Sequence, residues 1–75
     1  MKELIEYIAR NLASKPDEVK VTEEIEDDRV VLRLEVADED KGKVIGRQGR
    51  VAQAMRVVLR VAAVKNGTRA ILEIV

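Results

Sequence analysis

Two glycines bracket an arginine and a glutamine near the middle of this 75-residue chain, in the segment Val44-Ile45-Gly46-Arg47-Gln48-Gly49. A turn edged by glycines lets another backbone come close, because no Cβ stands in the way. Arg47 can form paired hydrogen bonds with phosphate oxygens, and Lys43 and Arg50 add positive charge nearby. Amides at such a turn and at the start of the next helix also favour an anion. The segment therefore predicts a site for a phosphate chain, with a plain corner between two helices as the alternative.

The positive charge of the chain is concentrated in the half that contains this segment. Residues 1–40 carry six basic and thirteen acidic side chains, a net charge of −7, whereas residues 41–75 carry eight basic and one acidic, a net charge of +7. Such asymmetry predicts a polyanion as partner of the second half. Attraction between the two halves is the alternative, and both can hold. Three basic residues are expected to be ordinary solvated charges: Lys41, Arg56 and Arg60.

The first half predicts a helix followed by a hairpin. Residues 2–13 have apolar side chains at helical spacing, and Pro16 ends that helix. Residues 19–25 and 30–36 alternate between apolar and polar side chains, as half-buried strands do. A polar turn at 26–28 joins them, so the two strands should pair.

The second half predicts two helices and a strand. Asp38 can cap a short helix that ends near Gly46, and a second helix runs from just past Gly49 to about Val64. Residues 69–75 alternate as a third strand. The buried face of the longer helix is expected to consist of Val51, Met55, Val58, Leu59 and Ala62.

These elements give the order α-β-β-α-α-β. A strand, two helices and a strand form a crossover, which places the last strand parallel to the second. We therefore expect an α+β fold, a two-layer sandwich with a three-stranded mixed sheet and three helices on one face. With 75 residues, 47% of them apolar, the chain is expected to form one domain over residues 1–75.

This order, with the glycine-edged turn between the two central helices, resembles a KH domain of the bacterial, type II arrangement. It is similar over the whole chain to the small single-domain KH proteins of bacteria, the KhpA family. The resemblance implies binding of single-stranded RNA, with the turn clamping about four nucleotides. It implies that Gly46 and Gly49 allow close approach and that Arg47 and Gln48 face the sugar-phosphate chain. The predicted RNA-binding residues are Lys43, Val44, Ile45, Gly46, Arg47, Gln48, Gly49 and Arg50.

The resemblance also assigns a role to the two apolar residues ahead of the turn. Val44 and Ile45 would help to floor the groove in which bases lie. The only aromatic residue, Tyr7, is in the first helix, so stacking of bases on rings is not expected to drive affinity. Single-stranded DNA remains an alternative ligand, because no residue pattern here separates the two sugars.

A second surface is predicted on the longer helix. Val57, Val61 and Val64 recur at helical spacing beside its expected buried face. They form either the edge of a wide buried face or a patch for a partner helix or a second copy. Members of the resembled family self-associate and pair with a larger RNA-binding protein, KhpB (also called Jag). The resemblance therefore implies a homodimer or a heterodimer with a KhpB/Jag-type protein through this helix.

Catalysis and cofactors are not expected. The chain has no histidine and no cysteine, so its hydroxyl groups lack the usual activating base. The acidic residues within 23–28 are expected to form a solvated hairpin turn rather than a cation site. No apolar run approaches the roughly 20 residues that span a bilayer, and acids stand near the N-terminus where a signal peptide would be apolar. We expect no metal, no membrane association and a cytoplasmic location.

These observations together predict a non-enzymatic protein that binds single-stranded RNA. The resemblance implies an RNA chaperone or post-transcriptional regulator with links to cell shape. The alternative is a protein-interaction adaptor that dimerises through its long helix and binds little RNA.

Overall fold

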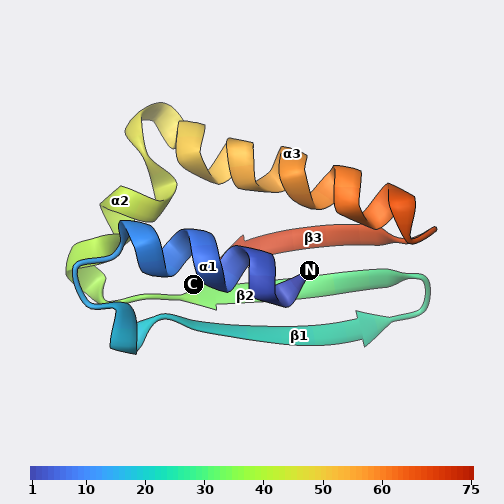
Figure 1. The fold of residues 1–75 in the computed structure, drawn as a ribbon, viewed down its shortest axis with the longest axis horizontal. Coiled ribbons are helices and arrows are strands. Elements are labelled where there is room, and N and C mark those ends of the chain that lie inside the picture. The colour runs from blue at the N-terminus through green and yellow to red at the C-terminus, as the bar shows by residue number, and fades with distance from the viewer.

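The computed structural model describes all 75 residues as a three-stranded sheet with helices on one face (Figure 1). The helices and strands are α1 (Lys2–Leu12), β1 (Lys20–Glu26), β2 (Arg29–Glu35), α2 (Lys41–Ile45), α3 (Arg50–Lys65) and β3 (Arg69–Ile74). Short 3₁₀ turns occupy Pro16–Glu18, Asp38–Asp40 and Arg47–Gly49. The predicted α-β-β-α-α-β order and the α+β sandwich are confirmed.

The strands lie in the order β1-β2-β3, with β1 antiparallel to β2 and β2 parallel to β3. The hairpin closes through the two residues Asp27 and Asp28, and Asp27 has a positive φ of 51°. Such a tight connection fixes the register of the two strands. The central strand β2 therefore has partners on both sides, whereas β1 and β3 each keep one free edge.

The core lies between the sheet and the helices. β2 supplies its centre, because Leu32 and Leu34 are completely buried. Each helix adds side chains above them, including Ile5 from α1, Val44 from α2 and Leu59 from α3. Both α2 and α3 therefore pack on the same apolar face of the sheet. This packing fixes the position of the turn that joins them.

Two side chains expected in the core are exposed instead. Ile25 is 74% exposed and lies near the end of β1, where the hairpin extends past the N-terminal end of α1 (Figure 1). Val58 is 41% exposed, because α3 is rotated relative to the expected orientation. The buried residues of α3 are Ala52, Met55, Leu59 and Ala63. Alanines at two of these positions let the helix backbone approach the sheet closely.

The predicted helix cap at Asp38 is wrong. Asp38 makes no capping hydrogen bond and its carboxylate pairs instead with Lys41 Nζ at 3.1 Å. Asp40 has the structural role, since it is completely buried and its two oxygens accept the backbone N–H groups of Ser14 and Lys15 at 3.0 Å each. These hydrogen bonds fasten the segment after α1 to the start of α2.

The hydrogen bonds to Asp40 also favour its charged form. The Ser14 amide, and next the Lys15 amide, hold the pKa of the Asp40 carboxyl below its ordinary value. Because the pKa is lower in the folded state, this stabilisation is complete above the unfolded-state pKa of about 3.9. It is lost as the pH falls through the folded-state value.

Replacing Asp40 with Asn should therefore destabilise the fold in a pH-dependent way. We expect the melting temperature at neutral pH to fall by about 5–10 °C, and the difference from the parent to shrink below about pH 4. Thermal unfolding followed by circular dichroism across pH 2–7 measures both effects. Asp17→Asn, at an exposed position, is the control. An equal effect of both substitutions, or a pH-independent difference for Asp40→Asn, would contradict the assignment.

Candidate functional site

The chain reverses direction between α2 and α3 through backbone conformations that are rare in ordinary residues. Gly46 has a φ of 78°, Gln48 of 57° and Gly49 of 76°. The Gly46 N–H donates to Gly42 O at 2.9 Å, which ends α2, and the Gly49 N–H donates to Gly46 O at 3.1 Å, which closes the turn. Left-handed conformations at a non-glycine residue are strained and recur at functional sites. The turn is therefore a defined structure rather than a loose connection.

The two glycines are required for different reasons. A Cβ at Gly46 would lie 2.5 Å from Val51 Cγ2 and 2.8 Å from the Val51 backbone nitrogen. The backbone that comes close at Gly46 is therefore the first turn of α3 itself. A Cβ at Gly49 would meet no atom within 4 Å. Gly49 is the position at which the turn is open to an approaching ligand.

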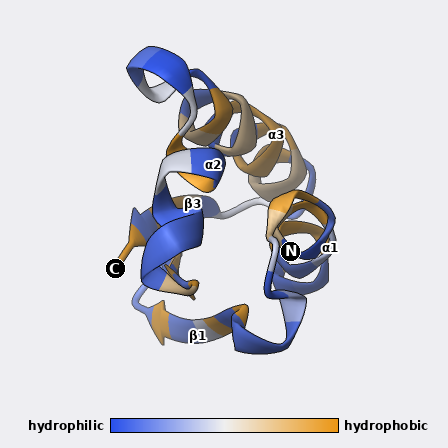
Figure 2. Cartoon of the chain, turned by 90° about the vertical axis from the view of Figure 1, so that its left-hand side faces the viewer, coloured by the Kyte–Doolittle hydropathy of each residue, from blue (hydrophilic) through white to orange (hydrophobic).

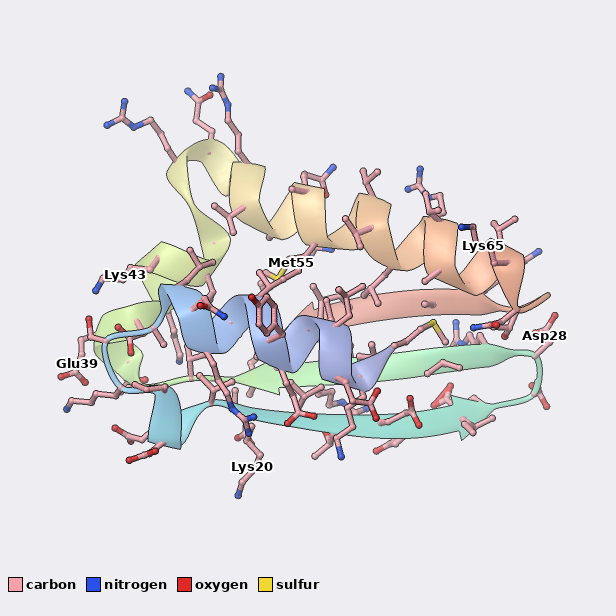
Figure 3. The ribbon with its side chains drawn as sticks, in the orientation of Figure 1. Lys20, Asp28, Glu39, Lys43, Met55 and Lys65 are labelled. Atoms are coloured by element: carbon pink, nitrogen blue, oxygen red, sulfur yellow. The ribbon has the colours of Figure 1, made fainter.

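The polar side chains of the turn extend into solvent. Arg47, Gln48 and Arg50 are exposed, and neither arginine has a carboxylate within 4.0 Å. Long, nitrogen-tipped side chains project from the turn in Figure 3, and Figure 2 shows the same hydrophilic segment standing clear of the molecule. These groups can donate hydrogen bonds to an anion without first breaking an ion pair.

The residues ahead of the turn divide between the surface and the core. Ile45 is 39% exposed and offers apolar surface beside the turn, whereas Val44 is completely buried. Lys43 Nζ lies 3.8 Å from Asp40 Oδ1 and also contacts Ser14 Oγ. Lys43 therefore belongs to the Asp40 cluster in this structure, and it would have to leave that cluster to reach a phosphate.

Ion pairs within the protein neutralise little of the positive charge of residues 41–75. Lys41 and Lys43 pair with Asp38 and Asp40, and Glu73 pairs with Arg33 at 3.1 Å. Six basic residues of this half have no carboxylate within 4.0 Å, namely Arg47, Arg50, Arg56, Arg60, Lys65 and Arg69. Attraction between the halves thus leaves an uncompensated positive surface on the turn, α3 and β3, as the polyanion interpretation requires.

The three valines of the predicted second surface lie outside the core. Val57, Val61 and Val64 are 52–70% exposed, so the interpretation as the edge of a buried face is wrong. With Val58 they form a valine stripe, defined here as Val57, Val58, Val61 and Val64, on the outer side of α3. Adjacent exposed valines on one helix are an unusual apolar surface for a small protein.

Comparison with known proteins identifies the family of the chain. The family model described as "KhpA/KhpB, KH domain" matches residues 2–74. The chain belongs to the KhpA/KhpB KH-domain family. This family is non-enzymatic, which confirms the prediction that the chain is not an enzyme. None of the helices has the length and apolar character needed to span a bilayer.

Curated relatives match the chain over nearly its whole length. "RNA-binding protein KhpA" of Clostridium acetobutylicum is 51% identical over 75 residues, and that of Clostridium perfringens is 47% identical, both covering all of each chain. The protein of the same name from Treponema pallidum is 49% identical over 74 residues, which are 99% of this chain and 92% of its own. No solved structure matches the chain.

Sequence reasoning missed one residue and one contact that shape the site. Asp40 was not predicted to have a structural role, because its partners at 14 and 15 are remote in the chain. The contact of Gly46 with Val51 could not be predicted either. In a sequence, a glycine that is needed for packing within the protein looks the same as a glycine that is needed for binding a ligand.

A glycine-to-alanine series should separate these roles. Gly49→Ala should cost roughly 1–2 kcal/mol for the positive φ alone, and Gly46→Ala should cost more because its Cβ also meets the Val51 backbone. Gly42→Ala, a control within α2 with open space around it, should stabilise the fold by about 0.5–1 kcal/mol. Urea unfolding gives the three values. Equal losses for Gly46→Ala and Gly49→Ala would contradict the packing argument.

Proposed function

We propose that residues 1–75 form a single KH domain that binds single-stranded RNA at the turn between α2 and α3. One observation supports this most directly. Arg47 and Arg50 are exposed, have no carboxylate partner and lie beside the open backbone at Gly49. Relatives with 40–51% identity are named RNA-binding proteins. The residues proposed to contact RNA are Lys43, Ile45, Gly46, Arg47, Gln48, Gly49 and Arg50, whereas the predicted Val44 is completely buried and supports Ile45 from the core.

Each group in the turn has a physical role in this proposal. The space at Gly49 admits the sugar-phosphate backbone, and the Arg47 guanidinium donates two hydrogen bonds to phosphate oxygens. The sixteen-residue helix α3 begins at Arg50, so its N-terminal amides favour the same anion. Ile45 contacts the bases, and Val44 supports it from the core.

The affinity of one domain should be modest. The turn has no aromatic side chain on which bases stack, since the sole aromatic residue, Tyr7, is on α1. Base stacking adds about 1–3 kcal/mol per base in proteins that use it. Contacts limited to phosphates and aliphatic surface fit transient holding of many RNAs. We therefore propose a cytoplasmic RNA chaperone or post-transcriptional regulator, with a connection to cell shape that follows from the family.

Reversing the charge of the turn tests the RNA site. Arg47→Asp with Gln48→Asp should weaken binding of a single-stranded RNA by at least about tenfold, because phosphate contacts are replaced by repulsion. It should also flatten the dependence of affinity on salt. Fluorescence anisotropy with a labelled oligomer at several salt concentrations measures both.

The matched control changes the same types of residue on α1. Arg10→Asp with Asn11→Asp makes the same change in net charge at exposed positions far from the turn in sequence. It should bind RNA within about twofold to threefold of the parent, as a change in net charge alone would allow. A folded turn variant that keeps the affinity and salt dependence of the parent would rule out the turn as the site.

The valine stripe favours a second function, association with another protein. We propose that it pairs either with a second copy of the chain or with a KhpB/Jag-type RNA-binding protein. Its residues repeat at helical spacing on the exposed side of α3, so a facing helix can bury them together. Pairing would also place two RNA-binding turns in one complex, which raises affinity for a long strand without new contacts.

A single charge in the stripe tests this proposal. Val61→Asp should reduce the sedimenting mass to that of a monomer, because a carboxylate buried between two helices is costly. Tyr7→Asp is the control, since it introduces the same charge at an exposed position on α1. If folded Val61→Asp protein sediments like its parent, both alone and mixed with a KhpB-type partner, the stripe is not an interface.

A further inference from the structure

A second positively charged site lies at the opposite end of α3 from the turn. A cavity of about 350 Å³ opens between the last turns of α3 and the start of β3, and three arginines line it: Arg29, Arg60 and Arg69. Figure 3 labels Lys65 and Asp28 at this end of the molecule and Lys43 at the other. Among the other lining residues, Ile71 is 38% exposed and provides apolar surface, whereas Ala63 is buried.

Two of these arginines have no partner within the chain. Arg29 Nη2 pairs with Glu26 Oε1 at 3.0 Å, whereas Arg60 and Arg69 have no carboxylate within 4.0 Å. The rim itself is fixed, because the Thr68 hydroxyl and the Arg69 N–H both donate to Asp28 O. A held cavity with unpaired guanidinium groups and an apolar wall is complementary to a phosphate attached to an apolar or aromatic body.

One side of α3 connects this cavity with the turn. Gln53, Arg56 and Arg60 are exposed and follow one another at helical spacing, and Arg56 Nη2 reaches Leu72 O on β3 at 3.5 Å. Arg60 lies about 15 Å along the helix from Arg50. The helix contains no acidic residue, so nothing along this side repels a polyanion.

We propose that the cavity is a second phosphate-binding site that takes a nucleotide of the RNA strand bound at the turn. The inference rests on the proposed RNA binding and extends it. Arg60 and Arg69 bind the phosphate, and Ile71 contacts the sugar or base. A KH turn clamps about four nucleotides, and the cavity lies about three helical turns further along α3, so only a longer strand reaches both sites.

The dependence of affinity on RNA length tests the second site. Anisotropy titrations compare a tetranucleotide with an oligomer of roughly ten nucleotides, for the parent and for Arg60→Gln with Arg69→Gln. We expect the gain in affinity from the short to the long oligomer to be about fivefold smaller in the double variant. The salt slope for the long oligomer should decrease by about 0.7, the value for one lost phosphate contact on a single strand.

A control variant and the short oligomer separate this site from the turn. Arg10→Gln with Lys20→Gln removes the same charge elsewhere and should keep the full length gain. The cavity variant should bind the tetranucleotide as this control does. Val64 lines the cavity and belongs to the valine stripe, so it is left unchanged.

Each outcome bears on one site or on both. If Arg60→Gln with Arg69→Gln keeps the length gain and the salt slope of the parent, the second site is disproved and the turn is unaffected. If Arg60→Gln with Arg69→Gln weakens binding of the long oligomer while Arg47→Asp with Gln48→Asp leaves it unchanged, the second site stands and the turn proposal fails. Binding of neither oligomer by the parent overturns both.

Discussion

The geometry of the candidate site depends on one contact, the approach of the α3 backbone to Gly46. With no Cβ at Gly46, the Val51 nitrogen comes to a distance that any side chain would prevent. This contact lets α2 end and α3 begin within a few residues while both helices still pack on the sheet. In the turn between the two helices, Gln48 has a positive φ of 57°, and Arg47 and Arg50 are exposed. The fold therefore supplies an open, preorganised turn before any ligand arrives.

The distribution of charge places this turn in the basic region of the molecule. The acidic first half engages its own cations and those at the start of α2, so Lys15, Lys41 and Lys43 are paired. The cations from the turn to the start of β3 remain free. A single chain with zero formal net charge thus presents one acidic and one basic region. Association with RNA through the basic region would be sensitive to salt. The acidic region would repel RNA and so limit its non-specific binding to the rest of the surface.

The sequence predicted the fold almost completely, because each element carried a clear period and a clear terminator. Pro16, the acidic hairpin turn and the glycines marked the boundaries, and the crossover fixed the parallel pairing of the last strand. The errors concern the rotation of α3 about its axis and the long-range hydrogen bonds of Asp40. The α3 face was misplaced because five valines fit more than one stripe of a helix, and only packing decides which stripe is buried. Asp40 was unpredictable because its partners lie about 25 residues earlier in the chain.

Mapping of amide chemical shifts tests the central claim most directly, since it reports where RNA contacts the folded protein. A tetranucleotide RNA titrated into isotope-labelled protein should perturb the amides of residues 45–50 and the first turn of α3 most strongly. The amides of α1 and β1 should remain almost unchanged. Perturbations centred on α1, or on the sheet face away from the helices, with residues 45–50 unaffected, would contradict the account.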